Sequence, residues 1–249
     1  MADHLSECIL VQVLKRLPVK PLFRCTAVEK SWYRLIKSPY FKTLYSSYHQ
    51  KNDKNKYLLF YAHNPPRFSL RHDDEQSKEY SPQLQFPIQE KRLQVYGISN
   101  GLICLSTRLD IQDLRKSIYL WNPVIRKSKT LPDSPLPSRD QLLQIRYCCS
   151  TAGLAFGYFA NMDDYRVVLF VTYHSLEGDD SRPDLFYVYV YSLTTNSWKT
   201  IDNLSEVPCY KISSSVVIDG SVYWLGEYCN LIAIVCFEVE NEIIRNLNL

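Results

Sequence analysis

Residues 5–32 constrain the fold of this chain more than any other stretch, because their apolar residues recur at helical spacing. The first helix is predicted to carry one apolar stripe, formed by Ile9, Leu10, Val13, Leu14 and Leu17. Pro18 ends this helix because proline cannot continue the backbone hydrogen-bond ladder, and Pro21 suits the first turn of a second helix. A third helix is predicted from Glu29 to Lys37. Three such short helices make a poor core, so we expect them to need a partner surface or a following domain.

A fourth, linker helix is predicted directly after these three. Ser38 can cap it and Pro39 can occupy its first turn. Its aromatic face is expected to pack on the downstream domain and consists of Tyr40, Phe41, Leu44, Tyr45 and Tyr48. Residues 50–56 are polar, so we predict a helical domain with its linker over residues 1–48 and a second domain over residues 56–249.

The positive charge of the chain is concentrated on the helical part. Residues 1–50 hold eight Lys or Arg and three Asp or Glu, a net charge of +5, whereas residues 51–249 hold twenty-one against twenty-three, a net charge of −2. The total of +3 is weak support for nucleic-acid binding, and we predict none. The basic excess is either a solubilising surface or a surface that meets an acidic partner.

The first residues also contain specific short sequence motifs. Arg16-Leu17-Pro18-Val19-Lys20, followed by Lys30-Ser31-Trp32, resembles the F-box of the large plant F-box family over about the first 45 residues. The resemblance implies that the helices dock on a Skp-type adaptor, which bridges to a cullin in a ubiquitin-protein ligase. Positions that match apolar sites of the motif imply adaptor-binding residues, namely Leu5, Ile9, Leu10, Leu14, Leu17, Pro18, Leu22, Val28 and Trp32. The alternative is a helical hairpin that packs on its own domain.

From residue 56 the pattern changes from helices to strands. Asn100-Gly101 lies between two apolar runs, which is the strongest short hairpin signal, and Asp219-Gly220 repeats it. Further hairpins are predicted around Asn122-Pro123, residues 162–164 and residues 194–197. The predicted fold class is therefore α+β, with a small all-α head followed by an antiparallel all-β domain.

The β part carries a second resemblance. Ser99-Asn100-Gly101-Leu102, Trp121-Asn122-Pro123 and Asn196-Ser197-Trp198-Lys199 resemble the F-box-associated domain of the same plant family, which is similar to a kelch-like propeller and implies substrate binding. The family includes the pollen S-locus F-box proteins, but no residue selects that group. Units of about fifty residues predict that the chain ends inside a third or fourth blade. Since rings usually close with about four to eight blades, we expect a truncated product or a partial, open sheet array.

Catalytic and metal-binding patterns are not predicted. The sequence has no Gly-x-Ser-x-Gly elbow and no phosphate-binding glycine loop. Cys148 and Cys149 are adjacent, without the two-residue gap that suits zinc. Asp163-Asp164 and Asp179-Asp180 are interpreted as loop carboxylates. We therefore predict a non-catalytic protein without a cofactor.

Location and function follow from these patterns as expectations. The early charged residues argue against a signal peptide, the apolar runs are too short for a membrane span, and the eight cysteines are expected to be free thiols in a cytoplasmic or nuclear protein. The favoured function is substrate receptor of a ubiquitin ligase, and the alternative is a decoy that occupies the adaptor without delivering substrate. Loops at 71–83, 132–144 and 174–184 are candidates for substrate contact, although no substrate residue is predicted.

Overall fold

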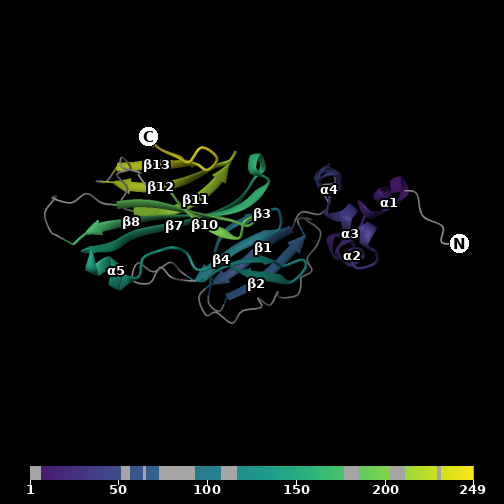
Figure 1. The fold of residues 1–249 in the computed structure, drawn as a ribbon, viewed down its shortest axis with the longest axis horizontal. Helices are drawn as coiled ribbons and strands as arrows, with labels where there is room; N and C mark the ends of the chain where they lie inside the picture. The colour runs from purple at the N-terminus through teal and green to yellow at the C-terminus, as the bar shows by residue number, and fades with distance from the viewer. Residues whose placement is uncertain are drawn as a thin grey trace. The chain divides into compact units, whose positions relative to one another are not determined.

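The computed structural model describes residues 7–51, 57–63, 66–72, 93–107, 117–176, 185–201, 211–228 and 231–248. The chain divides into two compact units, residues 1–89 with 123–126 and residues 90–122 with 127–249. Helices come first and antiparallel sheets follow, which confirms the predicted α+β class (Figure 1). The first unit holds the helices α1 Glu7–Leu14, α2 Val19–Cys25, α3 Lys30–Lys37 and α4 Pro39–Lys51 and the strands β1 Tyr57–His63 and β2 Pro66–His72.

The second unit, called the β unit below, is built from three four-stranded sheets. Sheet 1 contains β3 Leu93–Ser99, β4 Leu102–Thr107, β5 Ile118–Asn122 and β6 Lys127–Thr130. Sheet 2 contains β7 Tyr147–Phe159, β8 Asp164–Ser175, β9 Leu185–Ser192 and β10 Ser197–Ile201. Sheet 3 contains β11 Lys211–Ile218, β12 Ser221–Tyr228, β13 Leu231–Glu238 and β14 Ile243–Asn248. The helix α5 Arg139–Gln144 precedes β7, and the 3-10 turn η2 Ala160–Met162 joins β7 to β8.

Helices α1–α4 form one bundle around a small core. That core consists of Val11, Leu14, Leu22, Ile36 and Phe41, with seven half-buried apolar residues packed around it. Only part of the predicted α1 stripe faces inward, because Ile9 and Val13 are about half exposed whereas Val11, which the stripe omitted, is buried. Helix α1 is therefore apolar on two adjacent faces, of which one forms the core.

The linker helix corrects one expectation. Ser38 caps α4 as predicted, since its Oγ accepts a hydrogen bond from the backbone N–H of Phe41 at 3.1 Å. The apolar face of α4, however, packs within the helical bundle, where Phe41 is 1% exposed and Leu44 and Tyr45 contact the same core. The prediction that this aromatic face packs on the downstream domain was wrong for these three residues. The three short helices and this face of α4 therefore cover each other.

The hairpin β1–β2 follows in the first unit. The run Tyr57–Tyr61 lies in β1, and β1 pairs antiparallel with β2 so that Phe60 lies opposite Ser69. The strand β2 begins at Pro66. A proline is tolerated at the first residue of a strand because its missing N–H costs little there.

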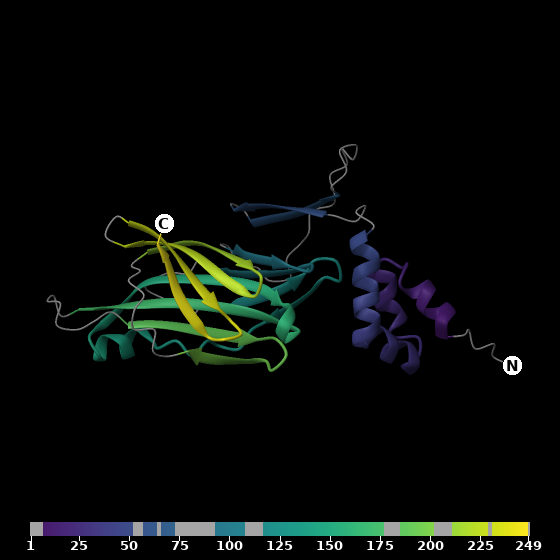
Figure 2. The ribbon, with the colours of Figure 1, turned by 90° about the horizontal axis from the view of Figure 1, so that it is seen from above.

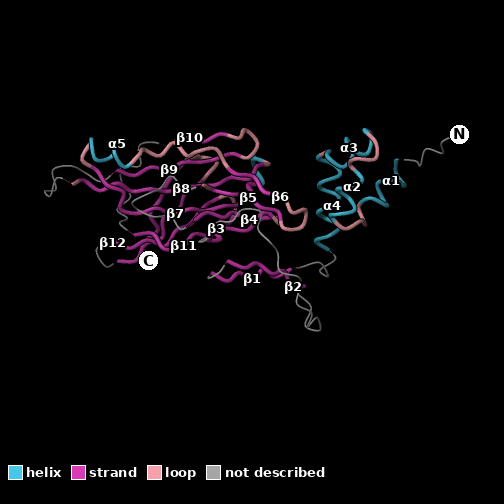
Figure 3. Tube along the Cα trace, turned by 90° about the horizontal axis from the view of Figure 1, so that it is seen from below, coloured by secondary structure: helices cyan, strands magenta, loops and turns pink. Residues whose placement is uncertain are grey.

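Each of the three sheets is a meander in sequence order, which is the topology of a propeller blade. The predicted hairpins are confirmed, and Figure 3 shows β10, β9, β8 and β7 in that order across sheet 2. Asn100-Gly101 and Asp219-Gly220 take positive φ angles of 46° and 78° and of 46° and 79°, as two-residue hairpin turns require. These turns set the registers Ser99 to Leu102 and Ile218 to Ser221.

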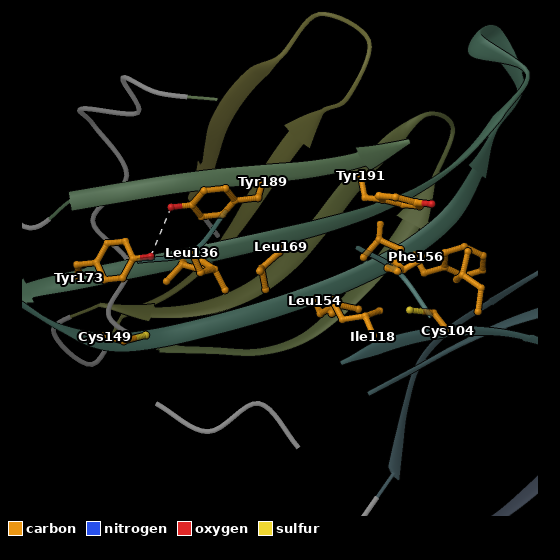
Figure 4. Close-up of a cluster of buried hydrophobic side chains, with 14 of the residues drawn as sticks. Cys104, Ile118, Leu136, Cys149, Leu154, Phe156, Leu169, Tyr173, Tyr189 and Tyr191 are labelled. Carbon is orange, nitrogen blue, oxygen red and sulfur yellow. Dashed lines mark hydrogen bonds between the residues drawn. The ribbon is translucent and has the colours of Figure 1, made fainter. Parts of the chain in front are cut away.

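Sheet 2 is buried on both faces. Along β8, Val167, Leu169 and Val171 belong to a core shared with sheet 1, which Figure 4 shows in close-up. The alternate residues Val168 and Phe170 belong to a second core shared with sheet 3. This arrangement explains why residues 167–171 read as a continuous apolar run, since a strand covered on both sides needs no polar face.

The first strands of the three sheets adjoin one another. Strand β7 contacts both β3 and β11, and Figures 1 and 2 show the three sheets layered in this order. Glycines permit the close approach: a Cβ on Gly97 would lie 2.8 Å from the backbone oxygen of Phe156, and a Cβ on Gly157 would lie 2.7 Å from a methyl group of Val217. The three sheets therefore pack as blade-like units, and Gly97 and Gly157 lie where neighbouring strands approach closely.

The candidate substrate loop 132–144 ends in a helix. Residues 131–138 lack regular structure, but α5 begins at Arg139. A capping box starts this helix: Ser138 Oγ accepts from the N–H of Gln141 at 3.2 Å, and the Gln141 side chain accepts from the N–H of Ser138 at 2.7 Å. The Ser-x-x-Gln pattern was a signal in the sequence for this helix.

Candidate binding surfaces

The helical bundle leaves a set of large apolar side chains on its surface. Val28, Ile9 and Val13 are 65%, 52% and 51% exposed. Val19, Phe23, Tyr33 and Tyr40 are also exposed. Apolar surface of this kind, gathered on so small a bundle, is typical of a protein interaction site.

The structure divides the nine predicted adaptor-binding residues into groups. Leu14 and Leu22 are buried in the bundle core, and Leu10, Leu17 and Trp32 are half-buried against it. Ile9, Pro18 and Val28 are exposed. Leu5 lies outside the described residues. The sequence motif therefore mixes residues that hold the bundle together with residues that present its surface.

The predicted adaptor-binding set omits Val13, Val19 and Phe23, which are also exposed on the bundle. Val13 stands four residues after Ile9 on α1, and Phe23 stands four residues after Val19 on α2. Residues four apart lie on one face of a helix. The signal was present in the spacing, but a partner-facing row cannot be told from a core-facing row without the neighbouring helices.

A shallow groove of about 470 Å³ lies at the corner between α2 and α3. Val28 and Tyr33 provide apolar surface in it, and Lys30 and Arg34 provide two positive charges against the one negative charge of Glu29. A partner that fills this groove would need an apolar side chain with acidic groups beside it.

Helix α4 holds the connection between α1 and α2 in place. The Tyr45 hydroxyl donates a hydrogen bond to the carbonyl oxygen of Leu17 at 2.9 Å, and a ring nitrogen of His49 lies 3.0 Å from the carbonyl oxygen of Lys15. Burial raises the pKa of Tyr45, so the phenol stays protonated and able to donate. The position of the Leu17-Pro18 corner therefore depends on the linker helix.

The β unit carries a second, larger hollow, called the inner-strand groove below. It measures about 720 Å³ and lies where the ends of β3, β7 and β11 meet. Its walls include Ile98 from β3, Tyr158 from β7 and Val216 from β11. The turns after β7 and β11 add Asn161 and Asp219, and the turn between β13 and β14 adds Glu240.

Hydrogen bonds between sheets fix the walls of the inner-strand groove. The N–H of Tyr158 donates to Ser99 Oγ at 3.0 Å, which ties sheet 2 to sheet 1. Ser215 Oγ donates to the carbonyl oxygen of Leu154 at 2.9 Å, which ties sheet 3 to sheet 2. The strands that form the groove are therefore tied together by hydrogen bonds between segments more than fifty residues apart.

The polar groups at the groove are partly paired with one another. The Tyr158 hydroxyl donates to Asp163 Oδ1 at 2.6 Å, and Asn161 Nδ2 donates to Glu240 Oε2 at 2.8 Å. The hydrogen bond to Asp163, with smaller contributions from burial and nearby charge, raises the pKa of Tyr158 to about 12. The phenol is therefore neutral at physiological pH.

The three predicted substrate loops have different outcomes. Of 71–83, residues 71 and 72 end β2 and the rest lie outside the described residues. Of 132–144, the second half is α5, with Leu143 about half exposed. In the loop 174–184, residues 174 and 175 end β8. Residues 177–184, which include Asp179 and Asp180, lie outside the described residues. None of these loops contributes to the inner-strand groove among its described lining residues.

The described residues provide no support for other site types. Among them, no group of three or more His, Cys, Asp or Glu side chains is arranged to hold a metal ion. No helix within the described ranges has the length and hydropathy needed to cross a membrane.

Comparison with known proteins matches this two-part architecture. Residues 3–44 match the model of the F-box domain, and residues 50–249 match the model of the F-box associated beta propeller domain. The sheet order and the helices thus define a protein with a small helical head and propeller-like blades. The chain belongs to the plant F-box proteins that carry an F-box associated β-propeller domain, which confirms the resemblance seen in the sequence.

The relatives are plant proteins of greater length. The chain is 31% identical over 248 residues to the Arabidopsis thaliana F-box protein At5g49610, covering 97% of this chain and 63% of the relative. It is 31% identical over 203 residues to the F-box protein CPR1 of the same plant, covering 80% and 45%. It is 26% identical over 242 residues to the Arabidopsis F-box/kelch-repeat protein At3g23880, covering 87% and 57%. The chain therefore spans roughly half of the length of these curated relatives.

Proposed function

We propose that this chain is the substrate-recognition subunit of an SCF-type ubiquitin-protein ligase. In this proposal the helical bundle binds a Skp-type adaptor, which bridges to a cullin, and the β unit binds a protein substrate. The observation that carries it is the exposed apolar surface of Ile9, Val13 and Val28 on a bundle that matches the F-box domain. The net charge of +5 on residues 1–50 supports an acidic partner surface, since complementary charge speeds encounter.

Eight of the nine motif residues, those within the described ranges, then have two roles. Ile9, Pro18 and Val28 contact the adaptor directly, together with Val13 and Phe23. Buried Leu14 and Leu22, with the half-buried Leu10, Leu17 and Trp32, hold the helices that present these contacts. The Leu17-Pro18 corner is kept in place by the hydrogen bond from Tyr45.

The chain itself supplies no chemistry in this proposal. It holds a substrate lysine close to the charged conjugating enzyme, and proximity of this kind raises the effective concentration of the reacting groups. Such an assembly would work in the cytoplasm or nucleus, where the cysteines stay reduced.

The test is capture of a purified Skp-type adaptor by the purified full chain, with surface variants chosen to spare the core. Val13→Glu places a charge in the exposed apolar surface, and we expect it to weaken adaptor binding by about tenfold or more, because central interface residues dominate affinity. Ile145→Glu is the matched control, since Ile145 is 52% exposed on the β unit. It should bind as the wild type does.

Two kinds of result would contradict the proposal, in its adaptor-binding part or in its substrate-receptor part. If the wild-type chain captures no adaptor, or if Val13→Glu and Ile145→Glu bind equally well, the helical surface does not dock there. If the chain captures adaptor and cullin but no bound partner becomes ubiquitinated in the reconstituted ligase, the chain acts as an adaptor-occupying decoy.

A further inference from the structure

The inner-strand groove has the size and shape of a ligand site. A volume of about 720 Å³ lies within the range of roughly 300–1,000 Å³ that is usual for binding pockets. It admits one or two side chains of a peptide rather than a folded domain. Its position at the ends of β3, β7 and β11 leaves it open to an extended segment.

Apolar side chains in the groove are left uncovered. Ile98 and Val216 face it from opposite sheets and are 55% and 50% exposed. Half-buried Tyr96 and Met162 lie between the same walls. Covering such side chains is favourable because apolar surface leaves water.

The charged groups at the groove are all of one sign. Asp219 and Glu240 are both exposed, and the described residues that line the groove include no lysine, arginine or histidine. Asp163 is not a lining residue, but its carboxylate accepts a hydrogen bond from the lining residue Tyr158. An acidic rim over an apolar wall attracts a cationic side chain and rejects an acidic one.

The walls are held before any ligand arrives. The inter-sheet hydrogen bonds from Tyr158 to Ser99 and from Ser215 to Leu154 fix the three strand ends. Asn161 likewise holds the Glu240 carboxylate in one position. A preformed site loses less conformational entropy on binding than a flexible one.

We propose that the inner-strand groove binds a protein segment that presents a lysine or arginine next to a large apolar residue. The cation meets Asp219 and Glu240, and the apolar residue covers Ile98 and Val216. This inference rests on the proposed function, because it assigns the class of substrate segment to the receptor part of the chain.

The test is selection of peptides from a phage-displayed library of random heptapeptides on the immobilised full chain. We expect enriched sequences to place Lys or Arg beside Leu, Ile, Phe or Tyr. Asp219→Asn/Glu240→Gln should abolish this enrichment and weaken the selected peptides by about tenfold in fluorescence polarisation. Asparagine suits position 219, where φ is 46°, so the turn is preserved.

The matched control removes the same charge elsewhere. Asp133→Asn/Asp140→Asn alters two exposed carboxylates of the β unit outside the groove and should leave peptide selection unchanged. The inference is overturned if no sequence class is enriched, if acidic peptides are enriched, or if both double variants behave alike. Nucleic-acid binding that competes with the peptides would likewise count against it.

Adaptor capture by the same proteins separates this inference from the proposed function. Asp219→Asn/Glu240→Gln should capture the adaptor as the wild type does. If the wild-type chain captures the adaptor but selects no peptides, the inference about the groove is refuted and the proposed function stands. If the wild-type chain captures no adaptor, the proposed function is refuted whatever the peptides show.

Discussion

Asp164 is a buried carboxylate that holds the turn between β9 and β10. It is 4% exposed and accepts hydrogen bonds from Ser192 Oγ at 2.5 Å, Thr194 N–H at 3.0 Å and Thr194 Oγ1 at 2.8 Å. Arg166 Nε lies 3.3 Å from the same carboxylate. Its role is therefore structural, although the sequence suggested only a solvent-exposed hairpin tip.

Asp164→Ala should lower the free energy of unfolding by about 2–3 kcal/mol, because three hydrogen bonds to a charged, buried acceptor are lost and their partly buried donors are left unpaired. Urea denaturation measures this loss. Asp140→Ala, at an exposed site on α5, should change stability by less than about 0.5 kcal/mol. Equal effects of the two substitutions would contradict the structural role.

Gly157 tests the close packing of sheets 2 and 3. A Cβ there would lie 2.7 Å and 3.1 Å from two side-chain carbons of Val217. Gly157→Ala should therefore destabilise the chain by about 1–3 kcal/mol through overpacking. Adding Val217→Ala should recover part of that loss, since it removes the obstructing methyl groups. A double variant no more stable than the additive sum would show that the two residues do not press on each other.

At the scale of elements, α4 acts as part of the helical bundle rather than as a separate spacer. Tyr45→Phe removes the hydrogen bond to Leu17 while keeping the ring in the core, so we expect a loss of about 1 kcal/mol. Hydrogen exchange should accelerate across α1 and α2 as well as α4. Tyr40→Phe, at a 66% exposed position, is the matched control and should leave exchange unchanged. Unaltered exchange in Tyr45→Phe would contradict the coupling.

The elements show what local pattern could predict. Hairpins were predicted wherever two apolar runs flanked a turn that demands positive φ, as at Asn100-Gly101 and Asp219-Gly220, because this chemistry acts within four residues. Helix α5 was not predicted, because the prolines before it favour irregular structure although a Ser-x-x-Gln cap begins the helix. The burial of Phe41 within the bundle was missed because a helix face does not show which neighbour covers it.

At the scale of the whole molecule, tyrosines whose pKa values are raised in the folded state make stability depend on alkaline pH. Burial raises the pKa values of Tyr173 and Tyr165, and the hydrogen bond to Asp163 raises that of Tyr158 to about 12. Below the ordinary pKa of 10.0 these phenols are protonated in both states. Above it the unfolded chain releases protons that the folded chain keeps, so stability must fall as pH rises.

Urea unfolding between pH 8 and pH 11 checks this dependence. The midpoint should be steady to about pH 9.5 and then decrease, and Tyr173→Phe should decrease less steeply because one raised phenol is absent. A midpoint that stays constant or rises above pH 10 would contradict the assignment.

The binding surfaces were less predictable than the fold. The adaptor-binding set came from a motif, and only the folded bundle separates exposed Ile9 and Val28 from buried Leu14 and Leu22. The inner-strand groove could not be predicted, because it joins strand ends that lie more than fifty residues apart. Contacts of such long sequence separation leave no local pattern.

The central claim is that the helical bundle binds another protein through its exposed apolar surface. Hydrogen exchange of the full chain with and without a purified Skp-type adaptor tests it most directly. We predict slower exchange over α1, α2 and the α2–α3 corner at Val28, with no change over β7 to β10. Unchanged exchange throughout α1–α3 at saturating adaptor would contradict the account.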